Sequence, residues 1–237
     1  MNLKEKIEAH NFYTGERVPY TFSVTEVCDN EPLKGYLSRK FEPKSEKVSQ
    51  ATLGNIFDVG MRQLVLDDVF GDTVKSGVRI LKQLPNGMFL SGEPDIIDQE
   101  NKVIYDVKLT KIYAYKKIIE EGVSHQYVKQ LNYYNSLLGG GYDLKLFLAL
   151  KDQSDVKPND PEAIEILDVP FIKHDELVRV ACEYGENVMA MLEGRASVPD
   201  KCSDVWGNSM RCKNFCSYNH VCPYGKKYYS KFSSWGV

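Results

Sequence analysis

The residues best suited to do chemistry lie between Leu90 and Lys117, where two aspartates and a lysine flank a predicted turn. Short apolar runs at 96–97 and 103–105 enclose the polar segment 98–101, a pattern typical of a β-hairpin. Strand side chains alternate between faces, so Asp106 and Lys108 should project together while Val107 points into the core. Closing the hairpin brings Asp95 towards Asp106. The sequence therefore predicts two carboxylates and one ammonium at a single place.

Such a group has an obvious chemical use. Two neighbouring carboxylates repel each other unless a cation lies between them. Carboxylate, water and phosphate oxygens are the ligands that Mg²⁺ and Mn²⁺ prefer, and a nearby lysine can orient a water or offset charge on a phosphate. The simpler alternative is a surface hairpin with a solvated aspartate and a salt-bridged lysine. Gly92 and Pro94 before Asp95, and the apolar residues around Asp106, favour the metal site.

Three sequence elements carry a resemblance to a known family. The segments 92–95 (GEPD) and 105–108 (YDVK) resemble the PD-(D/E)xK nuclease signature. The resemblance is to the RecB-like branch, which includes phage exonucleases and the iron–sulfur nucleases of CRISPR adaptation. A Gln-x-x-x-Tyr element of that branch appears as Gln130 and Tyr134, and a Gly-x-x-x-His element appears altered as Gly54 and Asp58. Together with a cysteine-rich C-terminus, these motifs occur in the family's order.

The resemblance implies a fold and a set of roles. The fold would be α/β, with a central mixed β-sheet flanked by helices in a restriction-endonuclease-like core and a cysteine-rich metal-binding segment after it. Asp95 and Asp106 would bind Mg²⁺ or Mn²⁺, with the backbone carbonyl of Val107 and the Asp58 carboxylate as further ligands. Lys108 would position the attacking water. Gln130 would orient Lys108 or the phosphate, and Tyr134 would support it.

The elements that position these residues follow from apolar spacing and turn signals. A Ser-x-Thr-Glu capping signal at 23–26 opens a helical stretch that reaches residue 37. The segments 74–83 and 87–90 are predicted to form β-strands, joined by a turn at 85–87. The spacing predicts helices over 49–70, 125–138 and 174–194, and strands over 144–150 and 163–170. This order of elements supports an α/β core.

The segment 110–121 mixes aromatic and basic residues. Aromatic rings with lysines suit stacking on bases and neutralising the phosphates of a single strand. A half-buried tyrosine pair with solvated lysines is an equally good interpretation. The predicted nucleic-acid contacts are Lys111, Tyr115, Lys116 and Lys117, with Tyr134 added from the next helix.

Four cysteines follow residue 197, at Cys202, Cys212, Cys216 and Cys222. Four close thiolates suit tetrahedral Zn²⁺ or a [4Fe–4S] cluster, whereas a disulfide framework fits an intracellular chain poorly. The resembled branch takes one ligand from an N-terminal helix, where Cys28 stands. Cys202 offers a local fourth ligand instead, and we prefer it because Cys28 could be a buried helix thiol. The resemblance favours [4Fe–4S] over zinc.

Composition limits the classes of protein that are possible. The 237 residues are 43% hydrophobic and 27% charged, which indicates a globular chain with a substantial core. We expect an N-terminal helical region (1–48), a nuclease core (49–196) and a cysteine-rich segment with a basic-aromatic tail (197–237). No apolar run approaches the ~20 residues of a membrane span, and the first residues lack the apolar stretch of a secretory signal. A cytoplasmic protein is expected, or one in the host cytoplasm if phage-encoded.

These observations favour a divalent-metal-dependent nuclease that hydrolyses phosphodiester bonds in DNA, either single-stranded or with free ends. By analogy with the family we expect an exonuclease of recombination, repair or phage replication. The net charge of −3 neither demands nor forbids such a partner. The alternative is a nucleic-acid-binding module that keeps the fold without efficient catalysis. Asp58 in place of histidine favours the alternative, and the intact Asp95, Asp106 and Lys108 favour the nuclease.

Overall fold

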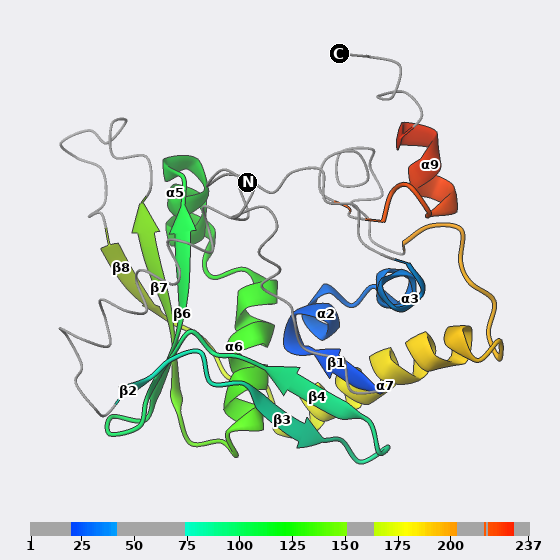
Figure 1. Ribbon diagram of the computed structural model, residues 1–237. Coiled ribbons are helices and arrows are strands. Elements are labelled where there is room, and N and C mark those ends of the chain that lie inside the picture. Colours follow the sequence, from blue (N-terminus) through cyan, green and yellow to red (C-terminus); the bar gives the residue numbers. More distant parts are fainter. Residues whose placement is uncertain (1–19, 42–73, 151–163, 203–215, 217, 230–237) are drawn as a thin grey trace, which may run out of the picture.

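Two β-sheets lie on either side of one helix, α6 (His125–Leu137), which contacts both of them (Figure 1). The structure, a computed structural model, describes residues 20–41, 74–150, 164–202, 216 and 218–229. The helix predicted over 49–70 lies outside these residues. The described residues form the predicted mixed sheet, with five strands, and a second sheet of three strands.

The five-stranded sheet is mixed and has the order β2-β5-β6-β7-β8. Its strands are β2 (Val74–Lys75), β5 (Ile96–Asp98), β6 (Val103–Thr110), β7 (Asp143–Leu150) and β8 (Ile164–Asp168). Only the central pair, β6 and β7, is parallel. Parallel neighbours need a crossover, which here consists of α5 (Ile112–Glu121) and α6 (His125–Leu137). The predicted strand at 144–150 and the predicted helix at 125–138 are therefore confirmed.

The predicted hairpin is formed by β5 and β6, with Ile96 opposite Tyr105 and Ile97 opposite Ile104. Its turn is closed by the buried Asp98 side chain, which accepts hydrogen bonds from the Asn101 backbone N–H at 2.9 Å and from the Asn101 amide at 2.8 Å. Aspartate is favoured in such turns because its carboxylate can replace a backbone acceptor.

The three-stranded sheet has the order β1-β4-β3, with β1 (Thr21–Ser23), β4 (Phe89–Gly92) and β3 (Ile80–Gln83). The capping signal acts as predicted: Ser23 and Glu26 form a reciprocal capping box at the start of α2 (Val24–Asp29). The helical stretch is shorter than expected, however. Residues 21–23 pair as a strand, and Asn30, at a φ of 49°, ends α2 before Pro32 opens α3 (Pro32–Lys40).

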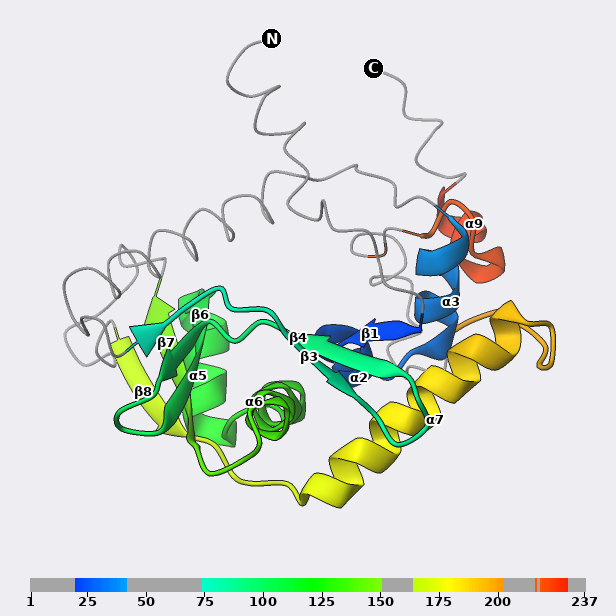
Figure 2. The ribbon, with the colours of Figure 1, turned by 60° about the horizontal axis from the view of Figure 1, so that its bottom comes forward.

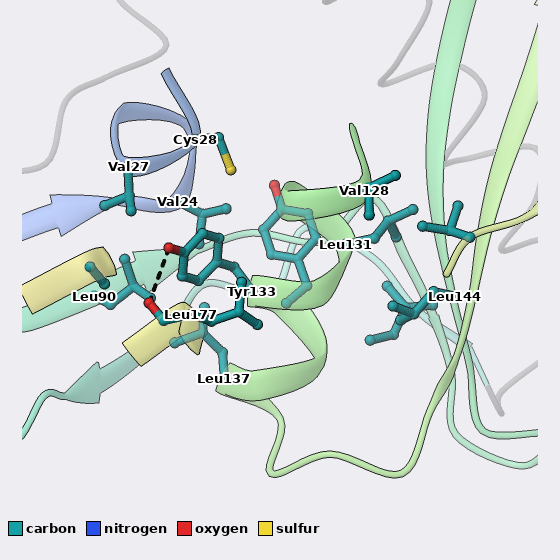
Figure 3. Close-up of a cluster of buried hydrophobic side chains, with 14 of the residues drawn as sticks. Val24, Val27, Cys28, Leu90, Val128, Leu131, Tyr133, Leu137, Leu144 and Leu177 are labelled. Atoms are coloured by element: carbon teal, nitrogen blue, oxygen red, sulfur yellow. Dashed lines mark hydrogen bonds between the residues drawn. The ribbon is translucent and has the colours of Figure 1, made fainter. Parts of the chain in front are cut away.

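The main core lies around α6, which packs against both sheets and against α7 (His174–Leu192) (Figure 2). Leu131 and Tyr133 of α6 are almost fully buried, and Figure 3 shows Tyr133 donating its hydroxyl hydrogen to the Leu177 carbonyl at 3.1 Å. Phe22 and Val24 belong to the same core. The N-terminal elements are thus packed into the same body as α6 and α7.

A second, smaller core joins the cysteine-rich segment to α3. Leu33 and Leu37 of α3 pack with Tyr218 and Cys222, just before α9 (Pro223–Tyr229), and α3 and α9 lie on the same side of the molecule (Figure 1). Among the described helices, none has the length and apolar character needed to cross a membrane.

Candidate active site

The hairpin places two carboxylates beside each other in a buried setting. Asp95 directly precedes β5, and Asp106 lies in β6, one position beyond the last β5–β6 pair. Only 7% of Asp95 is exposed, and Asp106 is fully buried. Asp95 Oδ2 accepts a hydrogen bond from the Val107 backbone N–H at 2.8 Å, which ties the two strands together past their last paired residues.

Asp106 is a carboxylate without adequate solvation. Neither of its oxygens accepts a hydrogen bond from the described residues, although the Lys108 ammonium nitrogen lies 2.7 Å from Oδ2 as an ion pair. Burial raises the pKa of Asp106 to about 7, and the neighbouring Asp95 adds to this effect while Lys108 opposes it. A buried charge with unused lone pairs is costly unless a further cation binds it.

Lys108 lies on the same face as Asp106, as predicted, because the two residues are separated by one position in a strand. Val107 points to the opposite face, where it packs with Val74 and Ile96. Burial alone lowers the pKa of Lys108, but Asp106 and Asp95 outweigh burial and raise it. Lys108 is therefore a cation at neutral pH, and its nitrogen lies 5.4 Å from the centre of the Tyr127 ring.

The donor set fits a hard divalent cation. Among the described residues no three histidine, cysteine, aspartate or glutamate side chains are close enough to hold a metal, and the described part of this site contributes the carboxylates of Asp95 and Asp106. Two carboxylates are what Mg²⁺ commonly takes from a protein, because it keeps several waters and binds substrate phosphate oxygens as well. The observation that supports this fit is the coordination left open at Asp106, whose Oδ1 accepts no hydrogen bond from the described residues and whose Oδ2 has the Lys108 ammonium beside it. Asp58 lies outside the described residues.

Gln130 and Tyr134 stand one turn apart on α6, and the structure pairs them with each other. Gln130 Nε2 donates to the Tyr134 hydroxyl at 2.9 Å, and Tyr134 is 4% exposed. Burial raises the pKa of Tyr134, with Asp106 and Asp95 contributing, which places the ring near both carboxylates. Gly92 makes this packing possible: a Cβ there would lie 2.9 Å from Tyr134 Cε1 and 2.8 Å from Leu137 Cδ1.

The predicted nucleic-acid contacts on α5 separate into exposed and buried residues. Lys111 and Lys117 are exposed, and Lys117 pairs with Glu121 at 3.6 Å. Lys116 is partly exposed. Tyr115 is fully buried in the main core, so its ring has no face to offer a base. Tyr115 is the residue of α5 that anchors the helix.

Two further aromatic residues lie on α5 and α6; Tyr113 belongs to the aromatic and basic segment 110–121, whereas Tyr127 was not among the predicted contacts. Tyr113 is the exposed tyrosine of α5, with 79% of its surface accessible, and Tyr127 lies over Lys108. Tyr127 precedes Gln130 by three residues and so shares its face of the helix. That spacing is the signal in the sequence that could have identified Tyr127, although it fits an apolar stripe equally well.

The cysteines fall into two different cores. Cys28 is part of the main core, where burial raises the pKa of its thiol to about 12. Cys202, Cys216 and Cys222 gather in the second core beside α3. Cys212 lies outside the described residues. Among the described residues, Cys202, Cys216 and Cys222 share this core without forming a group that could hold a metal.

Comparison with known proteins supports the fold. No protein-family model and no curated protein matches the sequence. Among solved structures, the crystal structure of SSO0001 is similar over 94% of both chains, with 18% identity and a TM-score of 0.59. The chain shares its mixed α/β fold, a mixed sheet with flanking helices, with SSO0001.

The other structural similarities are weaker. The alkaline exonuclease LHK-Exo from Laribacter hongkongensis has 12% identity and a TM-score of 0.49, over 74% of this chain and 89% of that chain. A structure of LHK-Exo in complex with dAMP has 14% identity and a TM-score of 0.47 over the same shares. The fold assignment depends on SSO0001 and on the geometry, since these TM-scores are below 0.5.

Proposed function

We propose that the protein is a divalent-metal-dependent nuclease that hydrolyses phosphodiester bonds in DNA. The observation that carries the proposal is Asp106, a fully buried carboxylate without a hydrogen bond from the described residues, placed beside Asp95 and Lys108. A purely structural role would leave such a group neutralised by hydrogen bonds. The arrangement of Asp95, Asp106 and Lys108 supports a site that binds a divalent cation together with a phosphate group of the substrate.

The roles of the side chains follow from their charges and positions. A bound Mg²⁺ or Mn²⁺ would supply Lewis acidity and a more acidic water. Asp95 and Asp106 would hold the ion, and the Val107 backbone N–H keeps Asp95 in place. Lys108, which pairs with Asp106, would also donate a hydrogen bond to the attacking water or to a phosphate oxygen. Its positive charge would stabilise the negative charge that develops on the phosphate during hydrolysis. The Gln130–Tyr134 pair would border the substrate on the α6 side.

A cleavage assay tests the proposal directly. Purified protein is incubated with end-labelled single-stranded and double-stranded DNA, with Mg²⁺, Mn²⁺ or EDTA. We expect degradation that requires the metal and that falls by about 10³-fold or more in Lys108→Ala. Lys145→Ala is the matched control, because Lys145 also pairs with an aspartate, Asp168, but on the outer part of the sheet. Metal-dependent binding without cleavage would instead support the non-catalytic binding module.

The exposed lysines of α5 provide a second prediction. Replacing Lys116 and Lys117 with alanine should weaken binding to single-stranded DNA, because fewer counterions are released when fewer phosphates are neutralised. We expect the slope of log affinity against log salt to decrease by roughly 0.7 for each phosphate that the variant no longer neutralises. Titrations between low and moderate salt, with Lys75→Ala as control, measure this slope. An unchanged slope would mean that both lysines face solvent and do not contact the phosphates of the DNA.

We also propose a metal centre in the cysteine-rich segment, with Cys202, Cys212, Cys216 and Cys222 as ligands and a [4Fe–4S] cluster preferred to Zn²⁺. Cys202, Cys216 and Cys222 belong to one core beside α3, but among the described residues they do not form a group close enough to hold a metal, so the proposal depends on the cysteine spacing and the family resemblance. Anaerobically purified protein should be brown, and Cys216→Ala should remove the colour and expose the segment to protease. Colourless protein with stoichiometric zinc would show that the centre holds zinc in place of an iron–sulfur cluster. Metal-free protein with an unprotected segment would exclude the centre.

A further inference from the structure

A cavity of about 380 Å³ lies between β3, β4, the second half of α6 and the first turns of α7. None of the proposed catalytic residues lines it. Its lining combines apolar side chains, called the floor below, with polar side chains, a combination typical of small-molecule sites of this size. The floor consists of Leu84, Pro85, Leu90, Tyr133, Leu137 and Val178, and the polar lining residues are Lys82, Gln83, Ser136, His174 and Asp175.

The walls of this cavity are held together by side-chain hydrogen bonds. Asn86, in the β3–β4 turn, donates to the Glu186 carboxylate at 3.1 Å and to the Cys182 carbonyl at 3.4 Å, both on α7. Tyr133 fastens α6 to α7 through the Leu177 carbonyl, as Figure 3 shows. The hydroxyl of Tyr133 is thereby occupied. The elements around the cavity are therefore linked by hydrogen bonds, and the cavity is preformed in the absence of a ligand.

A second cavity of about 180 Å³ shares three residues with the first: Lys82, Ser136 and His174. Lys82 donates to the Ser136 carbonyl at 3.0 Å and has no ion pair among the described residues. His174 Nδ1 lies 2.9 Å from Ser136 Oγ. The place where the two cavities meet thus offers an ammonium, an imidazole and a hydroxyl.

The charge around this place favours an anion. Asp175 is the one acidic residue among the described lining residues of the larger cavity, and no acidic residue lines the smaller one in the described part of the chain. Lys82 already binds a neutral carbonyl, which leaves its positive charge uncompensated. An anionic group bound there would gain charge-assisted hydrogen bonds from Lys82 and hydroxyl or imidazole hydrogen bonds from Ser136 and His174.

From this juxtaposition we propose that the cavity binds a nucleoside monophosphate. The flat base lies on the apolar floor formed by Leu84, Leu90 and Val178, and the phosphate binds Lys82, Ser136 and His174 where the cavities meet. Tyr133 and Tyr134 are adjacent on α6, with Tyr133 lining this cavity and Tyr134 facing Gly92. The proposed site is therefore separated from the catalytic carboxylates by α6 and does not require catalysis.

The test uses the full chain carrying Asp106→Asn in EDTA, so that neither turnover nor a metal ion contributes to binding. Calorimetric titration with dAMP should give a submillimolar Kd. Adenosine and inorganic phosphate should each bind at least about tenfold more weakly, because each satisfies only one half of the site. Lys82→Ala should weaken dAMP binding about tenfold, and Lys75→Ala, another exposed lysine, should leave it unchanged.

A second variant, Val178→Trp, fills the apolar floor and should prevent binding of dAMP. Thermal melting of each variant establishes that it is folded, and dAMP should raise the Tm of the parent but not that of Lys82→Ala. Phosphate binding as tightly as dAMP, or adenosine doing so, would overturn the proposal. So would the absence of dAMP binding, or binding that Lys82→Ala leaves unchanged. The cleavage assay remains independent of every one of these results.

Discussion

Asp106→Asn should remove nuclease activity and at the same time make the metal-free protein more stable. Activity falls because the substitution takes away a charged ligand, and we expect a loss of at least about 10³-fold. Stability rises because the wild-type carboxylate is fully buried without a hydrogen bond from the described residues. An amide of the same shape carries no charge to desolvate.

The pH dependence of this effect follows from the raised pKa of Asp106, about 7 in the folded protein against 3.8 for the ordinary group. Between these values the folded state binds more protons than the unfolded state, so the free energy of unfolding decreases as pH rises. Above pH 7 Asp106 is ionised in the folded protein, and the full free-energy cost of burying its charge lowers the stability. We therefore expect Asp106→Asn to be more stable than the wild type by about 1–3 kcal/mol at pH 8.

Urea unfolding at pH 5 and pH 8, in EDTA, measures the difference. At pH 5 the carboxyl is protonated in the folded state and ionised in the unfolded state, so only part of the cost is present and the advantage of the variant should be smaller than at pH 8. Addition of Mg²⁺ should stabilise the wild type and leave Asp106→Asn unchanged, a readout that does not depend on activity. The control is Asp168→Asn, at an aspartate whose side chain is 89% exposed. A variant that is less stable than the wild type at pH 8 would show that the Lys108 ion pair outweighs the cost of burying the Asp106 charge.

Gly92→Ala should damage both the fold and the site. Its Cβ would lie within 3.0 Å of atoms of Tyr134 and Leu137, so α6 must move away from β4. Overpacking of this kind costs about 1–3 kcal/mol. Because α6 also carries Gln130 and Tyr127, and Gly92 lies three residues before Asp95, we expect cleavage to fall by about 10²-fold.

The matched control is Gly87→Ala in the β3–β4 turn. Gly87 has a φ of +81°, which a side chain disfavours, but no atom lies within 4 Å of the Cβ that would be added. We expect a comparable loss of stability, about 1 kcal/mol, with unchanged cleavage. Denaturation curves and initial cleavage rates for the two variants separate a general loss of stability from displacement of α6. Equal activities in both would show that the close packing of Gly92 on Tyr134 is not needed for the site.

The sequence by itself determined the local parts of this protein. The β5–β6 hairpin, the capping box at Ser23 and the helices around Tyr134 and Leu177 depend on alternation, turn residues and spacing, all of which are short-range. The convergence of Asp95, Asp106 and Lys108 could be predicted for the same reason, because hairpin register and strand alternation determine the positions of all three side chains.

Only the tertiary structure decided what is buried, because burial depends on partners distant in the chain. Tyr113 and Tyr115 look alike in sequence, yet one is 79% exposed and the other is completely covered by the main core. The division into two sheets was likewise hidden, since β1 pairs with β4 across a long separation. Cys28 and Cys222 were equivalent thiols until packing placed them in different cores. The lack of hydrogen bonds to Asp106 within the described residues is also a property of the packed molecule, and it carries the functional proposal.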